Sequence, residues 1–174
     1  MSETRIGFGL LGAGLIAPFH ANSLKNSRNG KLVAIADLMP ERVQKVANEF
    51  SCAAYSSLDE LLANPEIQVI NVLTPNHLHF DAVVKAARAG KHVLVEKPPA
   101  MSLREVDEME RVARECGTKI GIVLQCRVRK AIQAMKTAID EGRFGRLLHA
   151  DTYMKWFRTT DYYLSDPWRS SRRS

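Results

Sequence analysis

Short apolar runs alternate with helical patterns along the first 125 residues of the chain. The runs expected to form buried strands are 6–11, 32–36, 53–55, 69–73, 92–96 and 120–124. Between them apolar residues recur at helical spacing, as in Val43, Val46, Ala47 and Phe50. This alternation is typical of βαβ units around a parallel sheet. The pattern therefore predicts a doubly wound α/β domain with six strands.

Residues that commonly begin helices stand where this pattern needs them. Pro40 suits the first position of the helix after the second strand. Ser57 with Glu60, and Ser102 with Glu105, have the spacing of a capping box. We therefore expect helices to begin directly after Ser57 and Ser102.

The pattern changes after Gly145. Two sets of residues alternate with a period of two over 147–157, which predicts one long strand of a different, antiparallel sheet. One set is Leu148, Ala150, Thr152, Met154 and Trp156, and the other is Leu147, His149, Asp151, Tyr153 and Lys155. Seventeen residues follow Phe157, which is too few to complete a sheet that buries its own face. We expect a domain over residues 1–125, followed over 126–174 by a connecting helix and the truncated beginning of a second domain.

The net charge of +6 does not favour a nucleic-acid partner. Residues 1–100 carry 10 basic and 9 acidic side chains, and residues 101–174 carry 15 and 10, so most of the surplus is late. No apolar stretch approaches the roughly 20 residues that a membrane span needs, and the N-terminus has no signal-peptide pattern. Three scattered cysteines indicate neither a disulfide framework nor a zinc site. We expect a cytoplasmic protein without a membrane partner.

A glycine-rich turn follows the first predicted strand. It fits the pattern G-x-G-x-x-G/A and consists of Gly12, Ala13, Gly14, Leu15, Ile16 and Ala17. Placed between a strand and a helix, this pattern is typical of a Rossmann domain that binds a dinucleotide. Gly12 permits the tight turn, Gly14 lets the backbone approach a pyrophosphate, and the helix N-terminus attracts its charge. An ordinary glycine turn is the alternative.

Asp37 ends the second strand, 23 positions beyond Gly14. Dinucleotide-binding domains carry an acidic residue about 20 residues after the glycines, where it binds the adenosine ribose hydroxyls. A carboxylate there would repel a 2′-phosphate, so NAD is favoured over NADP. Arg42 is near in sequence and keeps NADP open as the alternative.

A polar turn follows the fourth strand, which borders the first strand in this topology. It begins with Thr74, Pro75 and Asn76, and His77 and His79 come after it. The crevice between those two strands is where ligands bind in such sheets, so these residues are candidate cofactor contacts. Asn76 has the alternative role of a helix cap, and each histidine that of a surface or packed residue. No cluster of metal ligands accompanies them.

Glu96, Lys97 and Pro98 close the fifth strand. A lysine at this end of a strand lies over the nicotinamide half of the crevice, where it can polarise a hydroxyl group or accept its proton. Lys97 is therefore the candidate catalytic residue, with a solvated strand-end lysine as the alternative. A cis peptide bond before Pro98 is a further hypothesis.

These motifs, in this order, resemble those of the Gfo/Idh/MocA family of oxidoreductases. The matching segments are 9–17, 74–79 and 89–98, and the similarity continues through 142–145, 162–163 and 167–169. The resemblance implies an NAD(P)-dependent oxidoreductase of sugars, nucleotide sugars or cyclitols. It also implies a second α/β domain that covers the substrate and often mediates oligomerisation.

The resemblance implies roles for particular residues. In such enzymes Glu96 and Lys97 line the nicotinamide and substrate site, while Arg127, Trp168 and Arg169 match positions near the cofactor or substrate. Cys126 stands where related sequences often have asparagine.

The largest departure from the family comes at residues 170–174, where members continue with Gly-Thr and then supply a catalytic aspartate or histidine. We expect a chain that binds NAD but turns over a small sugar or polyol slowly or not at all. The alternatives are a catalytically silent NAD(H)-binding module acting through a partner protein, and a basic nucleic-acid-binding protein. A homo-oligomer formed through strand 147–157 is a further expectation.

Overall fold

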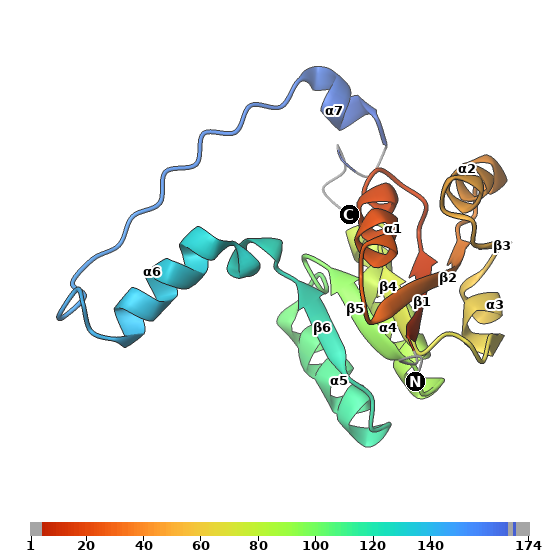
Figure 1. The fold of residues 1–174 in the computed structure, drawn as a ribbon, viewed down its shortest axis with the longest axis horizontal. Helices are drawn as coiled ribbons and strands as arrows, with labels where there is room; N and C mark the ends of the chain where they lie inside the picture. Colours follow the sequence, from red (N-terminus) through yellow and green to blue (C-terminus); the bar gives the residue numbers. More distant parts are fainter. Residues whose placement is uncertain (1–4, 167–168, 170–174) are drawn as a thin grey trace. The chain divides into compact units, whose positions relative to one another are not determined.

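The computed structural model describes residues 5–166 and 169. Six parallel strands form one sheet in the order β3-β2-β1-β4-β5-β6 (Figure 1). The strands are β1 (Ile6–Leu11), β2 (Gly30–Ala36), β3 (Ala53–Tyr55), β4 (Val69–Val72), β5 (His92–Glu96) and β6 (Ile120–Val123). This order confirms the predicted doubly wound α/β fold and places β4 beside β1.

Helices cover both faces of this sheet. They are α1 (Ala17–Lys25), α2 (Pro40–Phe50), α3 (Leu58–Ala63), α4 (His79–Arg88) and α5 (Leu103–Glu115). Ala34 and Ala36 belong to a core cluster shared with α3, α4 and α5, whereas Ile35 between them belongs to a cluster shared with α1 and α2. Because side chains alternate along a strand, the two clusters lie on opposite faces.

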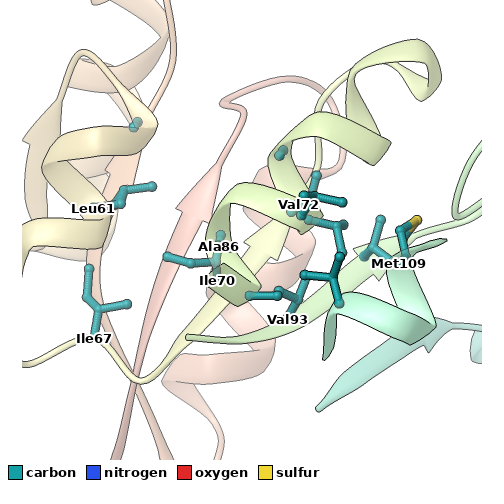
Figure 2. Close-up of a cluster of buried hydrophobic side chains, with 14 of the residues drawn as sticks. Leu61, Ile67, Ile70, Val72, Ala86, Val93 and Met109 are labelled. Atoms are coloured by element: carbon teal, nitrogen blue, oxygen red, sulfur yellow. The ribbon is translucent and has the colours of Figure 1, made fainter. Parts of the chain in front are cut away.

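The cluster beneath α3, α4 and α5 is built from branched aliphatic side chains and alanine. Figure 2 shows Leu61, Ile67, Ile70, Val72, Ala86, Val93 and Met109. Small residues such as Ala86 let α4 pack closely on the sheet, and the larger side chains fill the space to either side. This close packing fixes α4, and with it the loop that follows β4, relative to the strand ends.

The helix starts agree with the sequence except at Asn76. Ser102 and Glu105 form a complete capping box, and Ser57 Oγ accepts the backbone N–H of Glu60 over 3.3 Å. The alternative role of Asn76 as a helix cap is wrong. A 3-10 helix, η1 (Asn76–Leu78), begins at Asn76 itself, so this residue lies within the first turn, and Pro75 occupies the position before it.

The chain divides into two compact units, residues 1–123 and 124–174. The second contains η2 (Gln125–Val128), α6 (Lys130–Asp140) and α7 (Thr160–Leu164). The strand expected over 147–157 is wrong, because residues 147–159 form neither helix nor strand. A strand is held by hydrogen bonds to a neighbouring strand, and no described residue pairs with this segment. Its two sets of alternating side chains are both exposed, as at Leu148 and Tyr153.

Candidate functional site

The ends of three neighbouring strands meet at Gly12. The backbone N–H of Gly12 donates to the carbonyl oxygen of Ala36 over 2.7 Å, which ties the end of β1 to the end of β2. A Cβ at Gly12 would stand 2.9 Å from the carbonyl carbon and oxygen of Leu73, just beyond β4. Its φ of +106° also favours glycine. Glycine is therefore required here by both the backbone conformation and the close approach.

The next residues form an open cradle of backbone donors. A Cβ at Gly14 would meet nothing within 4 Å, so the space in front of the turn is clear. Among the described residues, no protein acceptor takes the N–H groups of Gly14, Leu15 or Ile16, and α1 begins without a side-chain cap. Free N–H groups at a helix N-terminus bind anions. This donor set fits the pyrophosphate of a dinucleotide.

Asp37 lies beside this cradle, directly after β2. Its Oδ2 accepts the backbone N–H of Ala13 over 2.7 Å, and its Oδ1 accepts that of Met39 over 3.0 Å. Each carboxylate oxygen has a second lone pair, so both can also accept ribose hydroxyls. The structure thus brings Asp37 to the glycine-rich turn, as its predicted role requires.

The end of β4 presents two polar atoms that have no protein partner. Asn71 is 2% exposed, and both its Oδ1 and the Oγ1 of Thr74 are buried without a hydrogen bond to any described residue. Buried polar atoms are nearly always paired with protein, water or ligand. These two buried atoms therefore carry hydrogen-bonding capacity that no described residue uses. Pro75 and Asn76, the other predicted contacts of this turn, are partly exposed.

A hydrogen-bonded row crosses from β4 to β5 through α1. Asn71 Nδ2 lies 3.3 Å from His20 Nδ1, and His20 Nε2 lies 3.0 Å from Glu96 Oε1. The second carboxylate oxygen of Glu96 accepts the backbone N–H of Lys97 over 3.2 Å. The row joins three elements at the carboxyl edge of the sheet.

The surroundings of Glu96 favour its carboxylate form. Burial disfavours the charge, but the hydrogen bond from His20, the charge of His20 when protonated and the contacts from Lys97 together outweigh it. The pKa of Glu96 is therefore lowered from its ordinary value. Glu96 acts here as an ionised acceptor rather than as an acid.

The side chain of Lys97 is exposed at the end of β5. Among the described residues none accepts a hydrogen bond from its Nζ, which leaves the ammonium group available to a ligand. The Lys97–Pro98 peptide bond is cis, which confirms the hypothesis from the sequence.

His79 is packed rather than directed into the crevice. Its ring is 0% exposed, with Nδ1 2.8 Å from the carbonyl oxygen of Pro98 and Nε2 2.8 Å from that of Thr74. Both nitrogens thus face backbone carbonyl oxygens, and the single N–H of a neutral imidazole can donate to one of them. The expected direct contact of His79 with a cofactor is corrected to the other interpretation, that of a packed histidine.

The remaining predicted residues belong to the second unit. Arg127 is exposed in η2, and the guanidinium of Arg169 lies 4.6 Å from the ring centre of Tyr162. Trp168 lies outside the described residues. The roles of Arg127 and Arg169 at a cofactor stay predictions.

Sequence reasoning missed two members of the row at the strand ends. Asn71 is the one polar residue in the apolar run 69–73. A polar residue inside a predicted buried strand is a signal that could have identified it. His20 follows the buried Ala17 by three positions and precedes the buried Leu24 by four, so it lies on the inner face of α1. A titratable residue on that face, close behind the glycines, could have been selected.

The described residues form neither a candidate metal centre nor a helix suited to cross a membrane. They contain no group of three or more His, Cys, Asp or Glu side chains that could hold a metal ion. None of their helices combines the length and the apolar character needed to cross a membrane.

The chain is similar to proteins that act on sugars and cyclitols. It is 37% identical over 147 residues to the 1,5-anhydro-D-fructose reductase of Ensifer adhaerens, which covers 84% of this chain and 44% of that protein. It is 31% identical over 142 residues to the inositol 2-dehydrogenase of Rhizobium meliloti (strain 1021), covering 82% and 43%.

A solved structure is similar over almost the whole chain. It is the WlbA dehydrogenase from Bordetella pertussis in complex with NADH and UDP-GlcNAcA, with a TM-score of 0.90 and 31% identity. The match covers 99% of this chain and 50% of that one. The chain thus spans about half the length of the relatives it matches.

The family model that matches describes an oxidoreductase family with an NAD-binding Rossmann fold, and it covers residues 6–123, more than half of the chain. The match includes the glycine cradle, Asp37, the turn after β4 and Lys97. This chain therefore belongs to the Gfo/Idh/MocA oxidoreductase family, and residues 6–123 form its NAD-binding Rossmann domain.

Proposed function

We propose that this chain is the cofactor-binding part of an NAD-dependent dehydrogenase that acts on a CH–OH group of a sugar, nucleotide sugar or cyclitol. The observation that carries the proposal is the cradle at Gly14, Leu15 and Ile16, whose backbone donors meet no protein acceptor among the described residues. The substrate class rests on the relatives, which are named for an anhydrosugar and an inositol or hold a nucleotide sugar.

Each part of the crevice has one task in this proposal. The N–H groups of the cradle hold the pyrophosphate, and Asp37 holds the adenosine ribose through its hydroxyls. Asn71 and Thr74, whose Oδ1 and Oγ1 have no hydrogen-bond partner among the described residues, lie near the end of β4, beside β1. When bound, NAD⁺ supplies the hydride acceptor.

Lys97 is the proposed partner of the hydroxyl group that loses its proton in the reaction. Oxidation of an alcohol to a carbonyl group releases the hydroxyl proton, which needs an acceptor. The Nζ of Lys97 accepts that proton as an amine or polarises the oxygen as an ammonium group. Its exposed position at the end of β5 leaves Nζ free for this contact.

NAD is proposed over NADP because of the charge at the adenosine end. The Asp37 carboxylate is held against the turn by two backbone N–H groups, so it stays where a 2′-phosphate would approach. The carboxylate and a 2′-phosphate are both negatively charged, so they would repel each other.

The test is a titration of the purified chain with NADH and with NADPH, followed by nicotinamide fluorescence or calorimetry. We expect a micromolar Kd for NADH, and a Kd for NADPH about tenfold higher, which corresponds to about 1.4 kcal/mol. Absence of NADH binding would contradict the proposal. Duplex DNA serves as a control ligand, because salt-dependent DNA binding without NADH binding would favour a nucleic-acid function instead.

A further inference from the structure

We infer that His20 and His79 are positioning residues for Lys97, holding the Glu96–Lys97–Pro98 turn from the two faces of the sheet. The inference rests on the proposed function, because it concerns where the ammonium group of Lys97 stands relative to the nicotinamide. Neither histidine contacts the cofactor in this arrangement. Each acts through the residue next to Lys97.

His20 fixes the residue before Lys97. An ionised carboxylate can only accept, so the proton between His20 and Glu96 belongs to His20 Nε2. The amide nitrogen of Asn71 faces His20 Nδ1 and can only donate, so Nδ1 is the unprotonated acceptor. The neutral imidazole with its proton on Nε2 therefore satisfies both neighbours. Through it, β4 and α1 together orient the carboxylate that binds the Lys97 backbone N–H.

His79 fixes the residue after Lys97. Its Nδ1 is 2.8 Å from the carbonyl oxygen of Pro98, and its Nε2 is 2.8 Å from that of Thr74. The ring thus lies between the carbonyl oxygens of the turns after β4 and β5, and it donates to both of them only when both of its nitrogens carry a proton. Because it is fully buried, no water competes for these contacts.

The two histidines approach from opposite sides. His20 belongs to α1, which packs on the same face as α2, whereas His79 begins α4, which packs on the face shared with α3 and α5. Lys97 lies between the two fixed residues with its own side chain exposed. A reacting group needs support of this kind, because a displacement of about 1 Å can cost a hundredfold in rate.

The test compares a ligand that reaches Lys97 with one that does not. NADH carries the nicotinamide, whereas ADP-ribose presents the same adenosine and pyrophosphate without it. We measure the Kd of both ligands for the wild-type chain and for the variants Lys97→Met, His20→Leu and His79→Leu. Each variant is expected to weaken NADH about tenfold, the loss of one charge-assisted contact, and to leave ADP-ribose within about twofold.

Two further measurements separate positioning from packing. His20→Gln keeps a donor toward Glu96 and an acceptor toward Asn71, so it should restore NADH binding that His20→Leu loses. In the double variant His20→Leu/Lys97→Met, the loss should equal that of Lys97→Met alone, because His20 acts through Lys97. His92→Gln, at the opposite end of β5, is the matched control and should bind both ligands as the wild type does.

The protonated nitrogen of His20 can be identified in the wild-type chain, so this measurement does not depend on whether a variant folds. Nitrogen NMR of the His20 ring should show a proton on Nε2, the nitrogen that faces Glu96. The reverse tautomer would overturn the proposed row.

The outcomes also separate this inference from the proposed function. A wild-type chain that binds neither ligand contradicts the proposed function itself. If NADH binds normally and Lys97→Met weakens it, but the histidine variants do not, only the positioning role is overturned. Equal weakening of NADH and ADP-ribose by the histidine variants overturns it as well, since general loss of structure produces that result.

Discussion

The carboxylate of Asp37 and the backbone N–H of Ala13 are joined by a hydrogen bond of 2.7 Å, which links the end of β2 to the middle of the glycine-rich turn. The residue expected to recognise the ribose therefore also shapes the loop that holds the pyrophosphate. Recognition of the adenosine end and the conformation of the turn depend on the same side chain.

Asp37→Ala should alter both stability and cofactor choice. Loss of the bonds to Ala13 and Met39 should lower the free energy of unfolding by about 1 kcal/mol, measured with urea. NADH should bind less tightly, and the ratio of the NADPH and NADH Kd values should fall toward one, because the repulsion of the 2′-phosphate is removed. Glu49→Ala, on the exposed side of α2, is the control and should change neither. An unchanged ratio would show that Asp37 does not select the cofactor.

Gly12→Ala should destabilise the fold. Its φ of +106° is unfavourable for alanine, and the new Cβ would stand 2.9 Å from the backbone of Leu73. We expect a loss of about 1–3 kcal/mol in the free energy of unfolding, measured by chemical denaturation. Stability equal to that of the wild type would mean that β1 and β4 do not approach this closely.

Gly14→Ala, two positions later, should have the opposite profile. Its Cβ would meet no protein atom within 4 Å, so stability should stay within about 0.5 kcal/mol of the wild type. The same methyl group would enter the space in front of the cradle and should weaken NADH at least tenfold, or about 1.4 kcal/mol. Fluorescence titration and urea unfolding on the same samples give both values. Unchanged NADH affinity would place the pyrophosphate elsewhere.

Glu96→Gln should make stability less dependent on acid pH. The folded chain lowers the pKa of Glu96 because the contacts from His20 and Lys97 outweigh burial. Such a group stabilises the fold above its unfolded pKa of about 4.3, and that contribution is lost as the pH falls through the lower folded value. Urea unfolding from pH 6 down to pH 3 should therefore show a smaller decrease for the variant than for the wild type. Equal decreases would mean that Glu96 is not stabilised as a carboxylate.

The strands and most helix starts could be predicted because they depend on local pattern, and the strand order follows from the doubly wound topology that this alternation indicates. Apolar runs such as 69–73, the glycines of the first turn and the serine caps each act within a few residues of their own position. The Asn76 cap was wrong for an equally local reason. The 3-10 turn begins one residue earlier than a cap at Asn76 would require.

Contacts between distant residues could not be read in the same way. His20 and Glu96 are 76 positions apart, and only the packing of α1 against the strand ends brings them together. His79 was noticed, but its direction depends on where the carbonyl oxygens of Thr74 and Pro98 lie. The period-two pattern of 147–157 predicted a strand that is not formed. A strand also needs a neighbour, which a local pattern does not specify.

The two hydrophobic clusters of the Rossmann domain, with the partly buried side chains packed against them, are built from residues between Phe8 and Ile120. Among the residues that the structure describes, the buried side chains of both clusters belong to the first unit. A Rossmann domain whose hydrophobic core is complete in itself can be joined to different substrate-binding domains without changes to the packing of that core. Cofactor recognition and substrate choice can therefore diverge separately in evolution, and the same independence makes residues 6–123 a portable part for building chimaeric enzymes.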